Sequence, residues 1–424
     1  MKHVIVGTGP AGVVAADTLR KLDPQCEITL IGSEPEPPYS RMAIPYYLTG
    51  KIDESGTYLR KQQDYFGQRR IDVHHARVEA VIPSTHCLKL QNGGELSYDK
   101  LLLATGSRPL SPPVTGVDHE RVVHCWTLDD ARRIAQFAQS GNRIVLIGAG
   151  FIGCIILEAL AKRGTHLTVV EMGERMVPRM MDGKAGGLLK EWCEKQGISV
   201  LTGTRITGIE TSLHAAATPL SVLCDGRPAL PADLVVLATG VKANADFLSG
   251  SGIKVDQGIV VDRHMRASIE DIYAAGDVAQ GLDFSTGDWQ VQAIQPTAAD
   301  HGLIAARNMA GHKARHQGNL NMNVLDTLGL ISSAFGLWQG VEGGDSAVLY
   351  DRGRYRYINL QFQEDVLVGA TCVGHTRHIG VLRGLIQTGV HLNGWKTKLM
   401  RDPTRFMEAY LASVEPLGFN ARLL

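Results

Sequence analysis

The chain has 424 residues, of which 44% are hydrophobic and 20% are charged, which is enough apolar material for more than one core. Its 43 Lys and Arg balance 43 Asp and Glu, and no basic run suggests a nucleic-acid partner. No uninterrupted apolar stretch approaches the roughly 20 residues of a membrane helix, and Met1 leads directly into a strand, so we expect no signal peptide, no membrane contact and a cytoplasmic location.

The first predicted element is a short apolar strand over residues 3–6, which runs into a glycine-rich loop and a helix. Such glycines permit a tight turn and bring backbone amides close to a pyrophosphate at a helix N-terminus. A second strand over 27–31 leads to Glu34, whose carboxylate is placed to accept hydrogen bonds from an adenosine ribose, the alternative being a solvated loop glutamate. The predicted nucleotide-binding residues here are Gly7, Gly9, Pro10, Ala11, Gly12 and Glu34.

The same signature recurs after a second apolar strand, over 143–147. A further strand over 166–170 ends at Glu171, where a carboxylate bonds an unsubstituted 2′-hydroxyl and repels a 2′-phosphate. The second site should therefore prefer NAD(H) over NADP(H), although Arg175 and Arg179 follow closely and could weaken that preference. Two complete copies argue against coincidental glycine turns. The predicted residues of the second site are Gly148, Gly150, Phe151, Ile152, Gly153 and Glu171.

Three further strand ends fit the same plan. The runs 101–106 and 234–240 are continuously apolar and end in Ala-Thr-Gly, and 273–277 ends in Ala-Gly-Asp. Continuous apolar runs suit strands buried on both faces, and a terminal glycine marks a close approach of the backbone to another group. The added candidates are Ala104, Thr105 and Gly106 for the first nucleotide, and Ala238, Thr239 and Gly240 for the second.

With these motifs the sequence resembles the FAD-dependent pyridine nucleotide-disulfide oxidoreductases, and within them the rubredoxin, ferredoxin and nitrite reductase flavoprotein branch. The resemblance covers residues 1 to about 315 well and the remainder loosely. It implies FAD at the first glycine loop and NAD(H) at the second. It also implies a helix that starts near residue 296 and points its positive end at the flavin ring. The FAD contacts implied by the resemblance are Arg41, Val78, Gly276, Asp277, Pro296 and Thr297, with Asp277 alternatively a helix N-cap.

The seven cysteines form no Cys-x-x-Cys or Cys-x4-Cys pair, so the chain lacks a dithiol relay. In the family's single-cysteine branch, which includes NADH oxidases and coenzyme A disulfide and persulfide reductases, the redox cysteine matches Met42 of this chain. Electrons are therefore expected to leave directly from the flavin.

The resemblance carries over no catalytic side chain. The lysine that ferredoxin reductases place near the flavin aligns with Tyr46 or Tyr47, which leaves Tyr46 as the one candidate beside the flavin. A glutamate that the family places near the nicotinamide is Ile155 here, and the next acid, Glu158, lies about one helical turn further on. Hydride transfer to a flavin depends mainly on positioning, which does not require such a side chain.

The order of the motifs predicts an α/β fold of two Rossmann-like nucleotide-binding domains, with the NAD domain inserted in the FAD domain, plus a C-terminal α+β domain. The expected boundaries are 1–110 and 245–315 for FAD, 111–244 for NAD and 316–424 for the C-terminal domain. In the last, we expect antiparallel strands over 347–350, 355–362 and 366–370 and helices over 376–388 and 403–413. In the family this domain forms a dimer interface or faces the acceptor, so a homodimer is compatible with it.

Charge in the C-terminal domain suggests a partner. Residues 351–405 hold nine Lys or Arg against four Asp or Glu, so one hypothesis is that this face docks an acidic rubredoxin or ferredoxin. The alternative is a solvated face balanced by neighbouring acidic surface. Cys372, His375 and His378 lie close in sequence but lack a paired motif, and we predict no metal.

The sequence thus predicts an FAD-dependent NADH:acceptor oxidoreductase that transfers hydride from NADH to FAD and then electrons to a small redox protein or a partner redox subunit. One alternative is a flavin oxidase or a sulfur-compound (persulfide or CoA-disulfide) reductase, which Met42 disfavours. Another is a non-catalytic FAD- and NAD-binding structural or regulatory subunit, suggested by Ile155 and by the missing lysine.

Overall fold

The computed structural model describes residues 1–211 and 219–420, with side chains up to residue 413. Its first unit is a parallel five-stranded sheet in the order β19-β7-β1-β2-β3. Helices α1 and α7 cover it. They approach each other so closely that a Cβ at Gly302 on α7 would lie 2.3 Å from the carbonyl oxygen of Ala11 on α1. The elements are β1 (Lys2–Val6), α1 (Pro10–Leu22), β2 (Glu27–Gly32), β3 (Ile71–His75), β7 (Lys100–Leu103), β19 (Ile272–Ala274) and α7 (Gln295–Met309).

The second unit repeats this construction in a parallel sheet ordered β12-β11-β10-β16-β9. Its central strand has the register of its counterpart: Val6 lies between Ile31 and Leu103, as Ile147 lies between Val170 and Leu237. The elements are β9 (Val122–His124), α4 (Leu128–Phe137), β10 (Arg143–Ile147), α5 (Phe151–Lys162), β11 (His166–Val170), α6 (Gly183–Lys195), β12 (Ser199–Leu201) and β16 (Leu234–Leu237).

Smaller elements link and flank these units. The chain passes between the two parallel sheets at β8 (Ser107–Pro109) and β17 (Val241–Ala243), which pair antiparallel. The three-stranded groups are β4 (Val78–Ile82), β5 (Cys87–Leu90) and β6 (Glu95–Ser97); β13 (Ile206–Thr211), β14 (Leu220–Cys224) and β15 (Arg227–Ala232); and β18 (Ile259–Val260), β20 (Ala279–Leu282) and β21 (Trp289–Val291). Two short helices are α2 (Ile44–Leu48) and α3 (Tyr65–Gln68).

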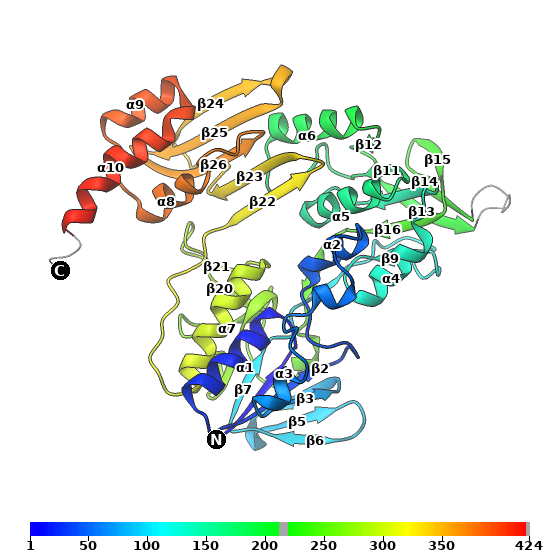
Figure 1. The fold of residues 1–424 in the computed structure, drawn as a ribbon, viewed down its shortest axis with the longest axis vertical. Helices are drawn as coiled ribbons and strands as arrows, with labels where there is room; N and C mark the ends of the chain where they lie inside the picture. Colours follow the sequence, from blue (N-terminus) through cyan, green and yellow to red (C-terminus); the bar gives the residue numbers. More distant parts are fainter. Residues whose placement is uncertain (212–218, 421–424) are drawn as a thin grey trace.

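The C-terminal unit is an antiparallel sheet ordered β22-β23-β26-β25-β24 between two helical layers (Figure 1). One face carries Ile358 and Leu360 and packs on α8, α9 and α10. The other carries Tyr357 and Val373 and shares a core with α5 and α6. The elements are β22 (Met322–Thr327), β23 (Leu330–Gly336), β24 (Asp345–Asp351), β25 (Arg356–Gln363), β26 (Val366–Val373), α8 (Gly380–Thr388), α9 (Gly394–Arg401) and α10 (Phe406–Asn420).

The α/β class with two parallel Rossmann-like sheets is as predicted, and so are the three predicted C-terminal strands. The sequence analysis missed β22, β23 and α9. Ser332 and Ser333 interrupt the apolar pattern of β23, and α9 is short and polar, so neither shows a clear period. Among the described residues, no helix is long and apolar enough to cross a lipid bilayer.

Candidate nucleotide-binding sites

Both glycine loops are built so that only glycine fits at their first position. Gly7 has φ +120°, and a Cβ there would lie 1.9 Å from the Ala104 carbonyl oxygen at the end of β7. Gly148 has φ +104°, and its Cβ would lie 2.4 Å from the Ala238 carbonyl oxygen at the end of β16. The strand ends Ala104 and Ala238 therefore support the loops by close backbone contact.

The middle glycine of each loop faces open space instead. A Cβ at Gly9 or Gly150 would meet no protein atom within 4 Å, although both residues have extended backbones that any side chain can adopt. They are the N-caps of α1 and α5, and neither helix has a side-chain cap for its first N–H groups. Free amide donors at a helix N-terminus beside open space fit a pyrophosphate, so the chain can hold two dinucleotides.

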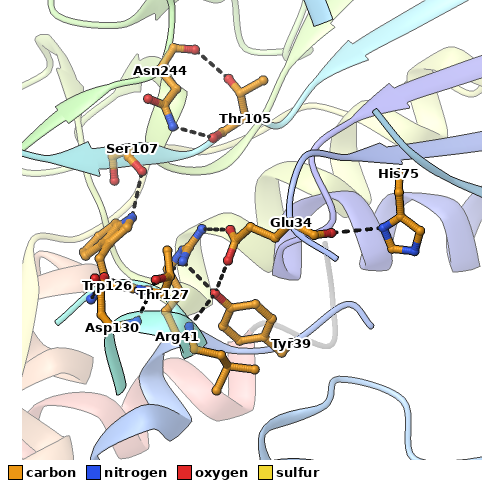
Figure 2. A network of polar contacts seen from close by, with 11 residues as sticks. Glu34, Tyr39, Arg41, His75, Thr105, Ser107, Trp126, Thr127, Asp130 and Asn244 are labelled. Carbon is orange, nitrogen blue, oxygen red and sulfur yellow. Dashed lines mark hydrogen bonds and ion pairs between the residues drawn. The ribbon is translucent and has the colours of Figure 1, made fainter. Parts of the chain in front are cut away.

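The glycines Gly106 and Gly240 at the two Ala-Thr-Gly ends also have positive φ and no neighbour within 4 Å of a built Cβ. Their threonines turn elsewhere. Thr105 Oγ1 donates to the Asn244 carbonyl at 2.7 Å, and Asn244 returns a bond to the Thr105 carbonyl at 3.1 Å (Figure 2). Thr239 donates likewise to the Leu110 carbonyl. Both predicted contact residues thus tie the strand ends to the crossing strands β8 and β17 through their hydroxyls.

Glu34 is held by two side chains that the sequence analysis did not connect with it. Arg41 lies 2.5 Å from its Oε1, and the Tyr39 hydroxyl donates to its Oε2 at 2.5 Å (Figure 2). Burial raises the pKa of Tyr39, so this hydroxyl keeps its proton at neutral pH. Glu34 is therefore an ordered carboxylate and not a freely solvated one. A cavity of about 380 Å³ beside it is lined by Ser33, Pro35, His75, Ala76, Arg77, Gln91 and Asn92, and Arg77 directly precedes the predicted FAD contact Val78.

Arg41 continues a polar chain toward Asp277. Its Nη1 donates to the Trp126 carbonyl at 2.6 Å, and the Trp126 indole N–H donates to the Ser107 carbonyl at 3.0 Å (Figure 2). The Ser107 hydroxyl in turn donates to Asp277 Oδ2 at 2.9 Å. Burial raises the pKa of the Asp277 carboxyl. Asp277 lies inside the short helix Gly276–Val278, whose N-cap is Ala275, so the N-cap alternative for Asp277 was wrong.

The N-terminus of α7 lies against the same region, and the helix starts next to the position that the resemblance implied. The helix begins at Gln295 with Pro296 in its first turn and has no side-chain cap, and Thr297 is buried. The Ser40 hydroxyl donates to Gln295 Oε1 at 2.6 Å. A Cβ at Gly276 would lie 3.2 Å from the Ala11 Cβ, so the starts of α1 and α7 converge on this turn.

On the second loop, Glu171 is fixed by the backbone. Its Oε2 accepts the Ala149 N–H at 2.7 Å and its Oε1 accepts the Gly173 N–H at 2.7 Å, which places the carboxylate at the mouth of the loop. Arg175 donates to the carbonyls of Met181 and Pro178, so its guanidinium is tied to its own loop.

The polar partners of Glu158 lie on α5 itself and in the C-terminal unit. Glu158 pairs with Lys162 and accepts the Leu328 N–H from the β22–β23 turn at 3.2 Å. Ile155 packs into the core shared by α5 and the C-terminal sheet. Phe151 and Ile152 in the first turn of α5 pack against the same core, and Glu158 belongs to the contact with the C-terminal unit.

Met42 and Tyr46 are both exposed, at 46% and 53%; Met42 lies in the short 3-10 helix Arg41–Ala43 just before α2, and Tyr46 lies in α2. The ammonium of Lys51 lies 5.6 Å from the centre of the Tyr46 ring. No cysteine shares this segment, since all seven lie elsewhere as free thiols, six of them buried.

Two basic residues of the C-terminal unit, Arg352 and Lys398, lie on opposite sides of its sheet. Arg352 pairs with Glu191 in the second half of α6 at 2.8 Å, whereas Lys398 lies 4.0 Å above the Trp395 ring on α9, across the sheet. Among the described residues no cluster of His, Cys, Asp and Glu is arranged for a metal ion. Cys372 is buried in the sheet, which raises its pKa to about 12, and His375 packs edge-on against Phe406.

Comparisons with known proteins agree with this geometry. The model of the family described as pyridine nucleotide-disulphide oxidoreductase matches residues 1–302. The NADH-dependent phenylglyoxylate dehydrogenase subunit epsilon of Aromatoleum evansii is 30% identical over 95% of each chain. In the solved covalent putidaredoxin reductase–putidaredoxin complex, a chain superposes with TM-score 0.88 at 27% identity, covering 97% of this chain and 98% of that one. An NAD-dependent persulfide reductase from A. fulgidus superposes with TM-score 0.85 at 28% identity, covering 93% and 78%.

Proposed function

Because the chain belongs to the pyridine nucleotide-disulphide oxidoreductase family, we propose that it is an FAD-dependent NADH oxidoreductase that delivers electrons to a small redox protein or a partner redox subunit. The observation that carries this proposal is the pair of glycine loops with matching register. Each ends in an uncapped helix N-terminus beside open space. One chain that binds two dinucleotides suits electron transfer between them.

The residues have separate tasks. We assign Gly7, Gly9 and the α1 amides to the FAD pyrophosphate, Glu34 to its ribose, and the N-terminus of α7 to the ring, where a positive helix end favours negative charge. Gly148, Gly150 and Glu171 take the corresponding parts of NADH. The chemistry supplied by bound FAD is the acceptance of a hydride from NADH, leaving NAD⁺, and the release of the two electrons singly. The protein orients the two ligands and excludes competing reactions.

Two relatives support the acceptor class. One is a reductase solved in complex with putidaredoxin, and another is a subunit of an NADH-dependent dehydrogenase. An exposed methionine on the segment beside the first site cannot form a redox disulfide, which favours direct transfer from the flavin to a separate protein. The proposal includes the domain boundaries predicted from the sequence, with FAD bound by 1–110 and 245–315, NAD(H) by 111–244, and a C-terminal domain over 316–424. It also includes a cytoplasmic location, which the seven free thiols support and which cell fractionation tests.

The test is an anaerobic titration of the purified yellow protein with NADH. Bleaching within seconds is expected, followed by reoxidation that is faster with a ferredoxin- or rubredoxin-type acceptor than with air. A protein that stays yellow would be a non-catalytic subunit. Fastest reoxidation by air or by a CoA persulfide would favour the oxidase or sulfur-reductase alternative, which the persulfide reductase relative keeps open.

Nucleotide preference is checked in the same experiment. The Glu171 carboxylate is fixed at the loop mouth, where it repels a 2′-phosphate, so NADPH should bleach the flavin more slowly than NADH. Equal rates with the two nucleotides would contradict the role given to Glu171.

A further inference from the structure

Helix α4 joins the two nucleotide-binding units. It packs on β9 and β16 of the second sheet, and its other side meets the segment 34–58, which contains the predicted site residues Glu34 and Arg41. Tyr39, Ile44 and Leu48 of that segment are buried in one cluster with Leu128, Ala131 and Ile134. We call the contact between residues 34–58 and α4 the seam.

Arg132, at the centre of α4, binds two carboxylates across the seam. Its Nε and Nη2 donate to the two oxygens of Glu54 at 2.9 and 2.7 Å, and its Nη1 donates to Glu36 Oε1 at 2.7 Å. The hydrogen bonds to Arg132 lower the pKa of Glu54, so the group is charged at neutral pH. A guanidinium that bonds both oxygens of one carboxylate fixes the relative orientation of the two side chains as well as the distance between them.

Burial distinguishes this group from an ordinary surface ion pair. The Glu36 side chain is only 9% exposed, although Arg132 itself is 39% exposed. A carboxylate that is largely removed from water raises the free energy of the folded protein when its cation is lost. Loss of Arg132 would therefore destabilise the seam by more than the loss of one partner destabilises a solvent-exposed ion pair.

The seam also lies where orientation matters. Glu34 and Arg41 belong to the same segment, and Arg41 bonds the Trp126 carbonyl just before α4 at 2.6 Å. The chain itself connects the two sheets at the short crossing strands β8 and β17. Contacts across the seam therefore restrain the orientation of one nucleotide-binding unit relative to the other, in addition to the link formed by the crossing strands.

We propose that Arg132, clamped by Glu36 and Glu54, is a positioning residue that sets the angle between the two nucleotide-binding units and thereby the rate of hydride transfer. The inference rests on the proposed function, because the rate concerned is that of flavin reduction by NADH. Reacting atoms must approach to about 3–3.5 Å, and an error of about 1 Å costs roughly 100-fold in rate. A small rotation would thus slow transfer while leaving each nucleotide's own contacts intact.

The test compares Arg132→Gln with Arg133→Gln in the FAD-loaded protein by anaerobic stopped flow. Arg133 is the matched control, since it occupies the next position of α4 and donates to the Glu120 carbonyl away from the seam. At saturating NADH, Arg132→Gln should reduce its flavin at least about tenfold more slowly, with NADH affinity within about twofold of the unsubstituted protein. Arg133→Gln should match the unsubstituted protein. Arg132→Lys, which keeps the charge but loses the planar fork, should be intermediate.

A second measurement does not depend on activity. In the protein without nucleotides, Arg132→Gln should speed hydrogen–deuterium exchange of amides in 36–58 and α4 but not in β1 or β10, and Arg133→Gln should not. If Arg132→Gln fails to fold, Glu54→Gln, which leaves the Glu36 pair in place, should show the same changes to a smaller degree.

Flavin reduction at the normal rate in folded Arg132→Gln, or in Glu54→Gln if the first variant fails, would overturn the proposal. Reduced thermal stability with an unchanged reduction rate would do the same, because it would make the clamp merely structural. If the unsubstituted protein is not reduced by NADH at all, the proposed function fails instead, and the exchange experiment still judges whether the clamp closes the seam.

Discussion

At the scale of single residues, the glycines of each loop divide into two kinds. Gly7 and Gly148 are required by the protein itself, because a side chain there would strike a neighbouring carbonyl in a left-handed backbone conformation. Gly9 and Gly150 are not required by any protein atom within 4 Å. We therefore propose that a bound nucleotide, and not the protein, requires glycine at these two positions.

Substitution separates these two roles. Gly9→Ala should leave the unfolding free energy of the apoprotein within about 0.5 kcal/mol of normal, but should weaken FAD binding because its methyl group occupies the pyrophosphate space. Gly7→Ala should destabilise the apoprotein by about 3 kcal/mol or more. Thermal unfolding and flavin fluorescence titration measure the two effects. Normal FAD affinity in Gly9→Ala would refute the ligand explanation.

Acid sensitivity should come partly from His301 on α7. The ring is buried, accepts a bond from Asn319 at 2.9 Å, and has its pKa lowered by burial to about 3. The unfolded chain takes up this proton near pH 6.5 and the native one does not, so stability falls as the pH drops from about 6.5 toward 3.

In urea unfolding across that window, His301→Gln should show a shallower loss of stability than the unsubstituted protein, by up to about 1.4 kcal/mol for each pH unit. His3, whose pKa burial lowers to about 4, contributes in the same direction and remains in both proteins. Parallel slopes would show that His301 is not the group responsible.

At the scale of elements, the C-terminal sheet is attached to the helices of the second unit by polar contacts along α5 and α6. Tyr357 donates to Asp182, the N-cap of α6, and the Trp192 indole donates to the Leu328 carbonyl at 3.3 Å. The Leu328 amide also donates to Glu158 of α5, so these hydrogen bonds attach the β22–β23 turn and β25 to helices α5 and α6. The C-terminal unit and the second nucleotide site should therefore behave as one body.

Tyr357→Phe tests this attachment. It removes a buried bond to a carboxylate and should lower the unfolding free energy by about 1.5–3 kcal/mol. The control is Tyr350→Phe, whose ring lies beside Tyr357 in the sheet but is 44% exposed, and which should stay within about 0.5 kcal/mol of normal. Equal losses in chemical denaturation would mean that the Asp182 contact contributes nothing specific.

At the scale of the whole molecule, the basic tip between β24 and β25 lies far from the glycine loops. Arg352 at this tip pairs with Glu191 of α6, and the tip lies in the upper part of Figure 1, whereas α1, which follows the first glycine loop, lies in the lower part. An acceptor docked at this tip would be separated from the first site by the second unit.

Reversing Arg354 and Arg356 to glutamate should therefore leave both the rate of acceptor reduction and its salt dependence unchanged. Steady-state reduction of a ferredoxin-type acceptor at several ionic strengths measures this. A slower rate with a flatter salt dependence would restore the docking hypothesis for these arginines.

The sequence by itself determined the two nucleotide-binding units. The reason is local: a strand, a glycine turn and a helix N-terminus are consecutive in the chain, and the first glycine of each turn, Gly7 or Gly148, is required by its own backbone. The acidic residues that follow β2 and β11 were predictable for the same reason, whereas the start of α7 was expected from the family resemblance. The burial of these strands on both faces of a sheet also followed from their continuous apolar runs, whereas their register did not.

Only the tertiary structure decided which distant groups meet. Arg41 reaches Trp126, Arg132 reaches Glu36 and Glu54, and Glu158 turns to the C-terminal sheet, and none of these pairs has a spacing that a sequence pattern reports. Side-chain partners separated by about a hundred residues depend on how helices pack on a remote segment. Packing is set by the combined burial of many side chains and not by any motif.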